Sequence, residues 1–83
     1  MNDCVTIDLS RLYAADGTAR LARLDDYVAA AFASVPPGAD ATLTGPAPVW
    51  LYLRLAHALH GRVRKLSYDS PVSGLVTVFD HTP

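Results

Sequence analysis

The hydrophobic pattern of the chain switches between a period of two and a period near 3.6, and this switching limits the fold more than any other feature. Val5 to Leu9 alternates apolar and polar residues, as a half-buried strand does. From Ala19 the spacing becomes helical, and Pro36-Pro37-Gly38 ends that helix. The apolar face of this helix is predicted to carry Leu21, Leu24, Val28, Phe32 and Val35.

The second half repeats the pattern. A strand is predicted at 41–44, a helix at 48–60, a strand at 63–68, a loop at 69–74 and a last strand at 75–79. The order β-α-β-α-β-β favours a single α/β domain over residues 1–83. Its first three strands should be parallel, and its last strand should lie antiparallel beside the third.

The amino-acid composition bears on the oligomeric state and the cellular location that we expect. With 83 residues, 51% of them hydrophobic, and a single cysteine, the chain has no internal disulfide to support a small core. We expect a homo-oligomer, a homodimer or homotetramer, with an alanine-rich compact monomer as the alternative. The lack of a signal pattern or a long apolar run predicts a cytoplasmic protein without a membrane span.

The net charge and its distribution limit the class of ligand that the protein can bind. The formal net charge of −1 argues against duplex DNA or long RNA, since both are bound through many phosphate contacts. Four of the seven basic residues nevertheless lie between positions 54 and 65. This cluster, formed by Arg54, Arg62, Arg64 and Lys65, suits either a small anionic ligand or a solvated helix end.

Ligands of parallel α/β sheets bind where the strands end and the loops enter helices. At that edge the sequence places a strand-turn-helix segment formed by Gly45, Pro46, Ala47, Pro48, Val49, Trp50 and Leu51. A glycine turn and a helix N-terminus can hold a phosphate without a basic side chain. The same segment is also common as a purely structural turn. Trp50 could stack on an adenine or belong to the core.

Three further positions could carry chemistry. His57 and His60 share one face of the second predicted helix, where they could bind a metal, transfer protons or form a polar helix end. Asp69 follows the third predicted strand and could bind a metal, orient a hydroxyl or start a turn. We expect Asp69, the Gly45 turn and the imidazoles to converge on one anion pocket, with Asp80 and His81 at the opposite edge.

Taken together, these residues form a series: Gly45-x-x-Pro48-x-Trp50-Leu51, Leu55-Ala56-His57-x-x-His60, Tyr68-Asp69, Gly74-x-Val76-x-Val78 and His81. The series resembles the small CRISPR-associated ring nucleases of the Csx-three type, over about residues 43 to 81. The resemblance implies a CARF-like, mini-Rossmann subunit that dimerises.

The resemblance also implies a function. Such a protein binds cyclic tetra-adenylate, the RNA messenger of type III CRISPR antiviral defence, and linearises it as a phosphodiesterase helped by a divalent metal, usually manganese. Carried over by position, His60 and Asp69 are the catalytic residues. His57, Asp69 and His81 are the candidate metal ligands, and the segment from Gly45 to Leu51 binds the substrate phosphates.

The chain departs from that pattern after Asp69. The run Ser70-Pro71-Val72-Ser73-Gly74 is one residue longer than usual and lacks the basic residue found there in the family. Losing a cation removes stabilisation from a transition state that gains negative charge. A non-cleaving sponge or sensor for the ring therefore stays open as an alternative, as does an accessory protein whose histidines hold a structural metal.

Overall fold

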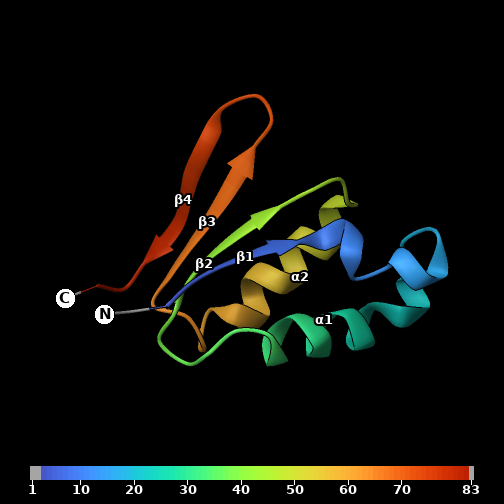
Figure 1. Ribbon diagram of the computed structural model, residues 1–83, viewed down its shortest axis with the longest axis horizontal. Coiled ribbons are helices and arrows are strands. Elements are labelled where there is room, and N and C mark those ends of the chain that lie inside the picture. Colours follow the sequence, from blue (N-terminus) through green and yellow to red (C-terminus); the bar gives the residue numbers. More distant parts are fainter. Residues whose placement is uncertain (1–2, 83) are drawn as a thin grey trace.

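The computed structural model describes residues 3–82 and confirms the predicted α/β fold and element order. Short 3-10 turns, absent from the prediction, connect the first strand to the first helix (Figure 1). The elements are the strands β1 Cys4–Asp8, β2 Asp40–Thr44, β3 Lys65–Ser70 and β4 Gly74–Asp80, the helices α1 Leu24–Ala33 and α2 Val49–Leu59, and the 3-10 turns η1 Leu9–Arg11, η2 Ala14–Asp16 and η3 Leu21–Arg23.

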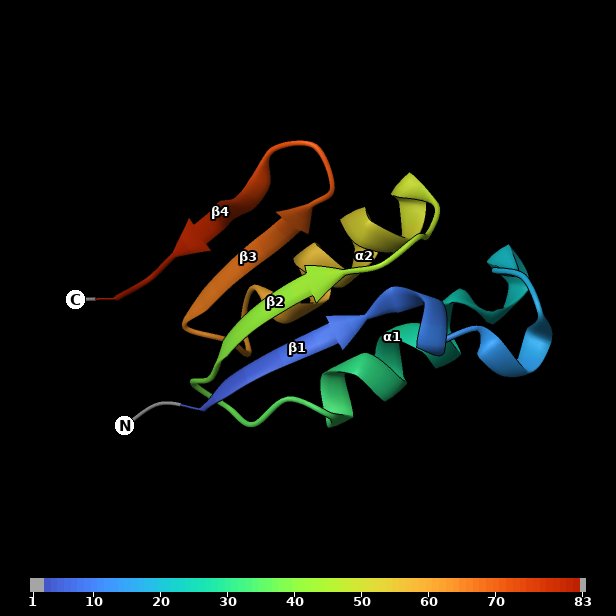
Figure 2. The same cartoon turned by 45° about the horizontal axis from the view of Figure 1, so that its top comes forward.

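The strands follow the order β1-β2-β3-β4 across one sheet. β1 pairs with β2 and β2 with β3 in parallel, and β4 returns antiparallel to β3, as predicted. The chain enters β1 and leaves β4 at the amino edge of the parallel strands (Figure 2). The carboxyl edge of β1, β2 and β3 therefore faces the opposite way, towards the loops that lead into the helices.

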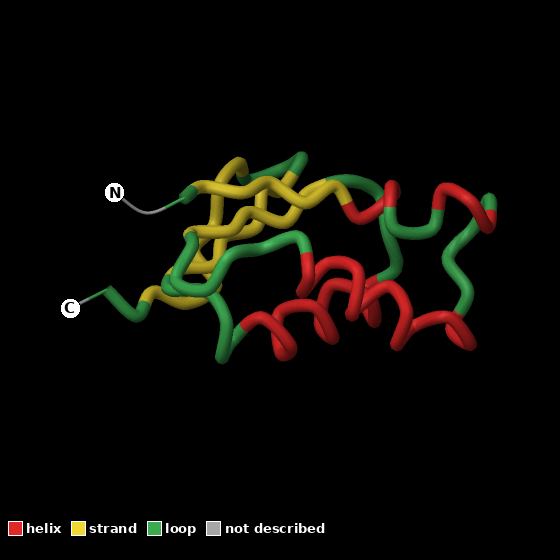
Figure 3. Tube along the Cα trace, turned by 60° about the horizontal axis from the view of Figure 1, so that its bottom comes forward, coloured by secondary structure: helices red, strands yellow, loops and turns green. Residues whose placement is uncertain are grey.

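Both helices cover the same face of the sheet, so the molecule has two layers (Figure 3). The core lies between them. Ile7, Leu43 and Leu66 point from the strands into it and are at most 6% exposed. From α2, three leucines spaced four residues apart are fully buried, and these are Leu51, Leu55 and Leu59. This spacing is the apolar stripe of an amphipathic helix packed on a sheet.

Among residues 3–82, no helix covers the opposite face of the sheet, and hydroxyl side chains cross the middle of this face. Thr6 pairs with Thr42, Thr42 with Ser67, and Ser67 with Thr77, so a row of hydroxyl side chains crosses all four strands. Alternation along each strand separates this row from the apolar residues of the core.

The first helix differs from its predicted form. It begins at Leu24 after the turn η3, and its buried residues are Leu24, Tyr27 and Ala31. Leu21 is 65% exposed and Phe32 37% exposed, so the predicted apolar face was wrong at these two positions. Leu21 lies in η3, and because a 3-10 turn has 3.0 residues per turn, it shifts the phase of the helical pattern before Leu24.

The hairpin between the last two strands is tighter than predicted. Asp69 and Ser70 belong to β3, and they pair with Leu75 and Gly74. The turn is therefore confined to residues 71–73. Ser70 Oγ accepts hydrogen bonds from the backbone N–H groups of two of these turn residues, Val72 and Ser73, each at 3.1 Å.

Within residues 3–82 neither α1 nor α2 combines the length and hydrophobicity that crossing a bilayer requires.

Candidate binding site at the carboxyl edge

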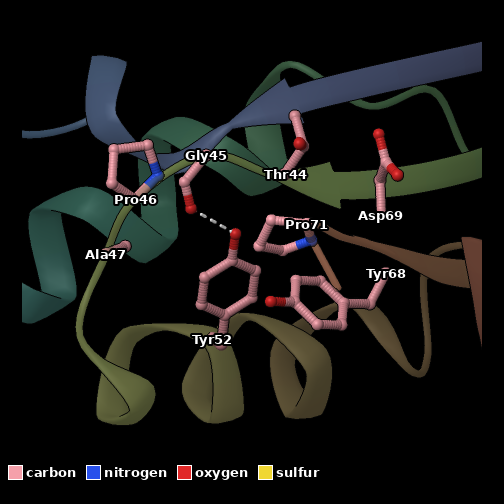
Figure 4. A pocket seen from close by; sticks show the side chains of 8 residues that line it. All are labelled: Thr44, Gly45, Pro46, Ala47, Tyr52, Tyr68, Asp69 and Pro71. Atoms are coloured by element: carbon pink, nitrogen blue, oxygen red, sulfur yellow. Dashed lines mark hydrogen bonds between the residues drawn. The ribbon is translucent and has the colours of Figure 1, made fainter. Parts of the chain in front are cut away.

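A cavity of about 560 Å³ opens at the carboxyl edge, between the ends of β2 and β3 and the start of α2 (Figure 4). It brings the Gly45 turn and Asp69 together, as the sequence predicted. Its volume is in the range of pockets that bind small molecules. The lining residues are Thr44, Gly45, Pro46, Ala47, Tyr52, Tyr68, Asp69 and Pro71.

The turn after β2 depends on glycine at position 45. Gly45 has a φ of +96°, a value that residues with a side chain rarely adopt. A Cβ atom added there would lie 2.1 Å from Oδ1 of Asp8, at the end of the neighbouring strand β1. Gly45 therefore lets the backbone of the turn pass directly against this carboxylate.

The Asp8 carboxylate is itself fixed. Its Oδ1 accepts hydrogen bonds from the Ser10 hydroxyl at 2.6 Å and from the Ser10 backbone N–H at 3.0 Å. These two hydrogen bonds lower the pKa of Asp8 below its ordinary value. An ionised Asp8 thus caps η1 and forms a rigid support for the Gly45 turn.

Two tyrosines hold the carbonyl groups of this turn. The Tyr52 hydroxyl donates to the Gly45 carbonyl, and the Tyr13 hydroxyl donates to the Pro46 carbonyl. Burial is the largest cause that raises the pKa of Tyr52, to about 12. The negative charges that nearby groups carry when ionised raise it further, and these groups are Tyr68, Asp8, Tyr13 and Asp69. Tyr52 is therefore a neutral hydrogen-bond donor throughout the physiological range.

Tyr52 and Tyr68 form an aromatic wall of the cavity. Their rings meet edge to face, with centroids 5.0 Å apart and an interplanar angle of 70°. Figure 4 shows both rings directed into the cavity from α2 and β3. Aromatic rings at a pocket wall can stack on a planar base.

The segment from Gly45 to Leu51 contributes only in part to the lining. Gly45, Pro46 and Ala47 line the cavity. Pro48 is the N-cap residue of α2, and no side chain of the described residues caps the helix there. The N-terminus of α2 thus keeps the positive dipole end that attracts anions.

The last three residues of that segment do not line the cavity. Leu51 is 0% exposed, so its side chain belongs to the core and does not line the cavity. Trp50 is half-buried and packs against the core. Val49 is 72% exposed and lies on another surface of α2.

Asp69 lies at the rim of the cavity. It is a strand residue, not the first residue after a strand as the sequence suggested. Its side chain is exposed, and Figure 4 shows the carboxylate pointing away from the two tyrosine rings. Asp69 can therefore reach a ligand that spans the mouth of the cavity.

The histidines lie elsewhere. The α2 helix runs back towards the amino edge, and the His60 ring there is 4.8 Å from the rings of both Phe79 and His81. Phe79 pairs with Leu66 and Asp69 pairs with Leu75, three residues further along β3. Because α2 and β4 both end at the amino edge, one subunit holds its His60–His81 pair and its Asp69 at opposite edges of the sheet.

The metal set suggested by the sequence does not assemble in one chain. His81 is beside His60 at the amino edge, whereas Asp69 is at the carboxyl edge. No three histidine, cysteine or carboxylate side chains among residues 3–82 come together as metal ligands would. His57, Asp69 and His81 therefore do not fit a single ion in one subunit.

The basic residues of the 54–65 cluster do not line the cavity. The Arg62 Nε donates to the Val35 carbonyl at 2.8 Å, and its guanidinium lies 4.5 Å from the centre of the Phe32 ring. Arg64 pairs with Asp40 at 3.1 Å. Within the described residues, the cavity lining contains no lysine or arginine. Neither arginine replaces the basic residue missing after Asp69 within the same subunit.

Several residues that line or support the cavity were given no role in the sequence analysis. Among them are Tyr13, Tyr52, Tyr68 and Asp8. The position of Tyr68 directly before Asp69 placed it at this edge, and Tyr52 lies one helical turn after Pro48. Asp8 could have been found from its place at the end of the predicted first strand, next to the end of the second.

The comparisons with known proteins agree with these motifs. The model of a family described as CRISPR-associated protein (Cas_csx3) matches residues 30–83, more than half of the chain. The chain matches no curated protein and no solved structure. The matched region contains β2, α2, β3 and β4, and so every residue that lines the cavity. The chain belongs to the Csx3 family of CRISPR-associated proteins.

Proposed function

We propose that this protein is a ring nuclease that binds cyclic tetra-adenylate and linearises it in type III CRISPR antiviral signalling. The observation that carries the proposal is the shared cavity, in which the Gly45 turn and Asp69 meet beside the start of α2. Family membership supports the CRISPR setting. The cyclic substrate and the cleavage reaction are carried over from the resemblance of the motifs.

The cavity suits an adenylate in two ways. The uncapped N-terminus of α2 offers a positive dipole to a phosphate. The Tyr52 and Tyr68 rings offer an aromatic wall to an adenine. In this proposal the phosphate lies beside the Gly45 turn, and the base lies against Tyr68.

The reaction needs both edges of the sheet. The 2′-hydroxyl oxygen of one adenosine attacks the adjacent phosphorus, and the bond from phosphorus to the 5′-oxygen of the next nucleotide breaks. The product carries a 2′,3′-cyclic phosphate and a 5′-hydroxyl. A base takes the proton of the 2′-hydroxyl and an acid gives a proton to the 5′-oxygen. Asp69 orients the attacking hydroxyl and His60 transfers protons.

Asp69 and His60 can meet only across two copies, because one chain holds them at opposite edges. We therefore place the ring between the carboxyl edge of one assembly and the amino edge of the next. This head-to-tail arrangement also brings Lys65, at the start of β3, towards the scissile phosphate. The facing edge thus supplies a cation in place of the basic residue missing after Asp69.

A binding function without cleavage is the second candidate. It is favoured by the cavity lining, where Asp69 is the single charged residue among those described. A sponge or sensor needs only the ring-binding cavity, and its affinity would not depend on His60. The amount of product formed separates the two functions.

The test mixes two inactive variants. His60→Ala keeps the carboxyl edge intact, and Asp69→Asn keeps the amino edge intact. We expect each variant alone to lose about 10²-fold or more of the cleavage rate of labelled cyclic tetra-adenylate. An equimolar mixture should recover about a quarter of the wild-type rate, because one in four random head-to-tail contacts joins two intact edges.

The control is Thr77→Ala, a change of the hydroxyl row on the open face, remote from both edges. It should cleave at the wild-type rate, because both of its edges are intact. An intact ring after incubation with excess wild-type protein, with and without manganese, would reject the nuclease. Two inactive variants that stay inactive when mixed would reject the shared site.

A further inference from the structure

The charges around the carboxyl-edge cavity do not suit an anion by themselves. Asp69 lies at the rim, and the ionised Asp8 packs against the Gly45 turn. No lysine or arginine among the described residues lines the cavity. A phosphate held there would meet two carboxylates, and only the dipole at the start of α2 would compensate for them. An anion site of this kind needs a cation that reaches in from outside the lining.

We propose that Arg11 supplies this cation, and that its guanidinium binds the phosphate that the cavity holds beside the Gly45 turn. This role rests on the proposed function for the identity of the ligand, a cyclic adenylate. Arg11 lies outside the residues matched by the family model, which begin at position 30.

The fold places Arg11 beside the turn. The turn η1, which ends at Arg11, begins directly after β1, at the same edge of the sheet as Gly45. Two contacts, one on each side of Arg11 in the sequence, hold this segment in place. The Asp8 carboxylate packs against Gly45, and the Tyr13 hydroxyl donates to the Pro46 carbonyl. The segment therefore runs along the side of the cavity that the Gly45 turn forms.

The side chain of Arg11 is available to a ligand. It is exposed, and it forms no hydrogen bond or ion pair with any of residues 3–82. The hydrogen bonds from Ser10, and after them the charge of Arg11, lower the pKa of Asp8, so the guanidinium lies within electrostatic range of the carboxylate that supports the turn. Four other arginines are held by partners within the domain, and these are Arg23, Arg54, Arg62 and Arg64.

The position of Arg11 separates its role from that of Lys65. In the proposed head-to-tail contact, Lys65 comes from the facing assembly, whereas Arg11 belongs to the subunit whose cavity holds the ring. Arg11 therefore stabilises the ring equally before and during cleavage. Uniform stabilisation of this kind lowers KM and leaves kcat unchanged. A guanidinium also offers two parallel N–H donors to phosphate oxygens, which a lysine ammonium does not.

The test is a calorimetric titration with cyclic tetra-adenylate at several salt concentrations. The variant is Arg11→Gln, and the matched control is Arg20→Gln. Arg20 is also exposed, but its backbone N–H donates to the Tyr27 hydroxyl at 3.2 Å, which places it beside α1. We expect Arg11→Gln to bind the ring about tenfold or more weakly. Its plot of log affinity against log salt should be shallower by up to about 0.7, since one phosphate contact is lost. Arg20→Gln should keep the wild-type affinity and salt dependence.

Three further measurements separate binding from a structural role. Arg11→Lys should keep the salt dependence, because the charge stays, but only part of the affinity. Urea denaturation of Arg11→Gln should give the wild-type midpoint, because the replaced side chain is exposed. In cleavage assays, the KM of Arg11→Gln should rise about tenfold while kcat stays the same. Wild-type affinity and wild-type salt dependence in Arg11→Gln would overturn the role of Arg11 and leave the nuclease standing.

A wild-type chain that binds no ring would instead reject the proposed function. ADP, which carries an adenine and phosphate groups, then replaces the ring as the probe, in a nuclear magnetic resonance titration of the same variants. Weaker binding of ADP by Arg11→Gln than by the wild-type chain would support Arg11 as the cation of the cavity. Equal binding by both, or no binding by the wild-type chain, would overturn it.

Discussion

Replacing Gly45 with alanine tests the support of the binding turn. The added Cβ would lie 2.1 Å from Asp8 Oδ1 and 3.3 Å from the Leu9 backbone nitrogen. Contacts under 3.0 Å do not persist, so the carboxylate has to retreat by about 1 Å. It cannot retreat freely, because the hydroxyl and the N–H of Ser10 both hold the same oxygen.

The matched control is Gly17→Ala. Gly17 has a φ of +76°, against +96° for Gly45, and its Cβ would have no atom within 4 Å. Both substitutions carry a backbone strain of about 1–2 kcal/mol for a side chain in the left-handed region. Gly45→Ala adds an overpacking cost of about 1–3 kcal/mol. The free energy of unfolding, measured by urea denaturation, should therefore fall further for Gly45→Ala than for Gly17→Ala by that second amount.

The clash can also be relieved by shortening the side chain of Asp8. Asp8→Ala in the Gly45→Ala background removes the carboxylate that the methyl group meets, so the double variant should lose less stability than the sum of the single variants. Equal losses of stability for Gly45→Ala and Gly17→Ala would refute the packing of Asp8 against the turn.

Two further predictions concern stability. The pKa of Tyr52 is about 12 in the fold against 10.0 for an ordinary tyrosine, so the unfolded state loses this proton first and stability should fall as the pH rises from about 10 to about 12. Tyr52→Phe should remove that part of the fall in the free energy of unfolding, measured by urea denaturation at alkaline pH. An unchanged dependence on pH in this variant would contradict the raised pKa. Leu55→Ala should lower the free energy of unfolding by about 2–5 kcal/mol in thermal or urea denaturation, because Leu55 is 0% exposed. Leu53→Ala should change the free energy of unfolding of the monomer by less than about 0.5 kcal/mol, because Leu53 is 66% exposed. Similar losses for both leucines would contradict the packing of α2.

The fold could be predicted from local patterns because they determine it directly. The period-two segments became β1 and β2, and the glycine and proline stops separated them from the helices. The predicted apolar face was wrong at Leu21 because η3 shifts the phase of the helical spacing before Leu24. It was wrong at Phe32 because a residue eight positions after Leu24 lies about 80° around the helix from it. Leu24, Tyr27 and Ala31 share one face of α1, and the predicted face missed the last two because it followed the spacing that starts at Leu21, outside the helix.

The candidate site was predictable where strand ends define it. Gly45 and Asp69 meet because β2 and β3 are parallel neighbours and Leu43 pairs with Tyr68. The imidazoles do not join them within a subunit, contrary to the convergence predicted from the sequence. The length of α2 explains the difference: eleven residues span about 16 Å, which carries His60 across the sheet to the amino edge.

Strand ends could have placed Asp8 at this edge, but the specific contacts of the turn could not be predicted from the sequence. That the carboxylate of Asp8 packs against Gly45 depends on the register in which Asp8 pairs with Thr44. The hydrogen bond from Tyr13 to the Pro46 carbonyl joins residues 33 positions apart. Such long-range contacts follow from packing of the whole domain and leave no local signal.

The most direct test of the central claim is a calorimetric titration with cyclic tetra-adenylate. It should be carried out on the wild-type chain, on Tyr68→Ala in the cavity wall and on Thr77→Ala on the open face. The wild-type chain and Thr77→Ala should bind the ring with the same affinity, and Tyr68→Ala should bind it about tenfold or more weakly, since stacking on a base is lost. No binding to the wild-type chain, or an undiminished affinity for Tyr68→Ala, would contradict the placement of the ring at the carboxyl edge.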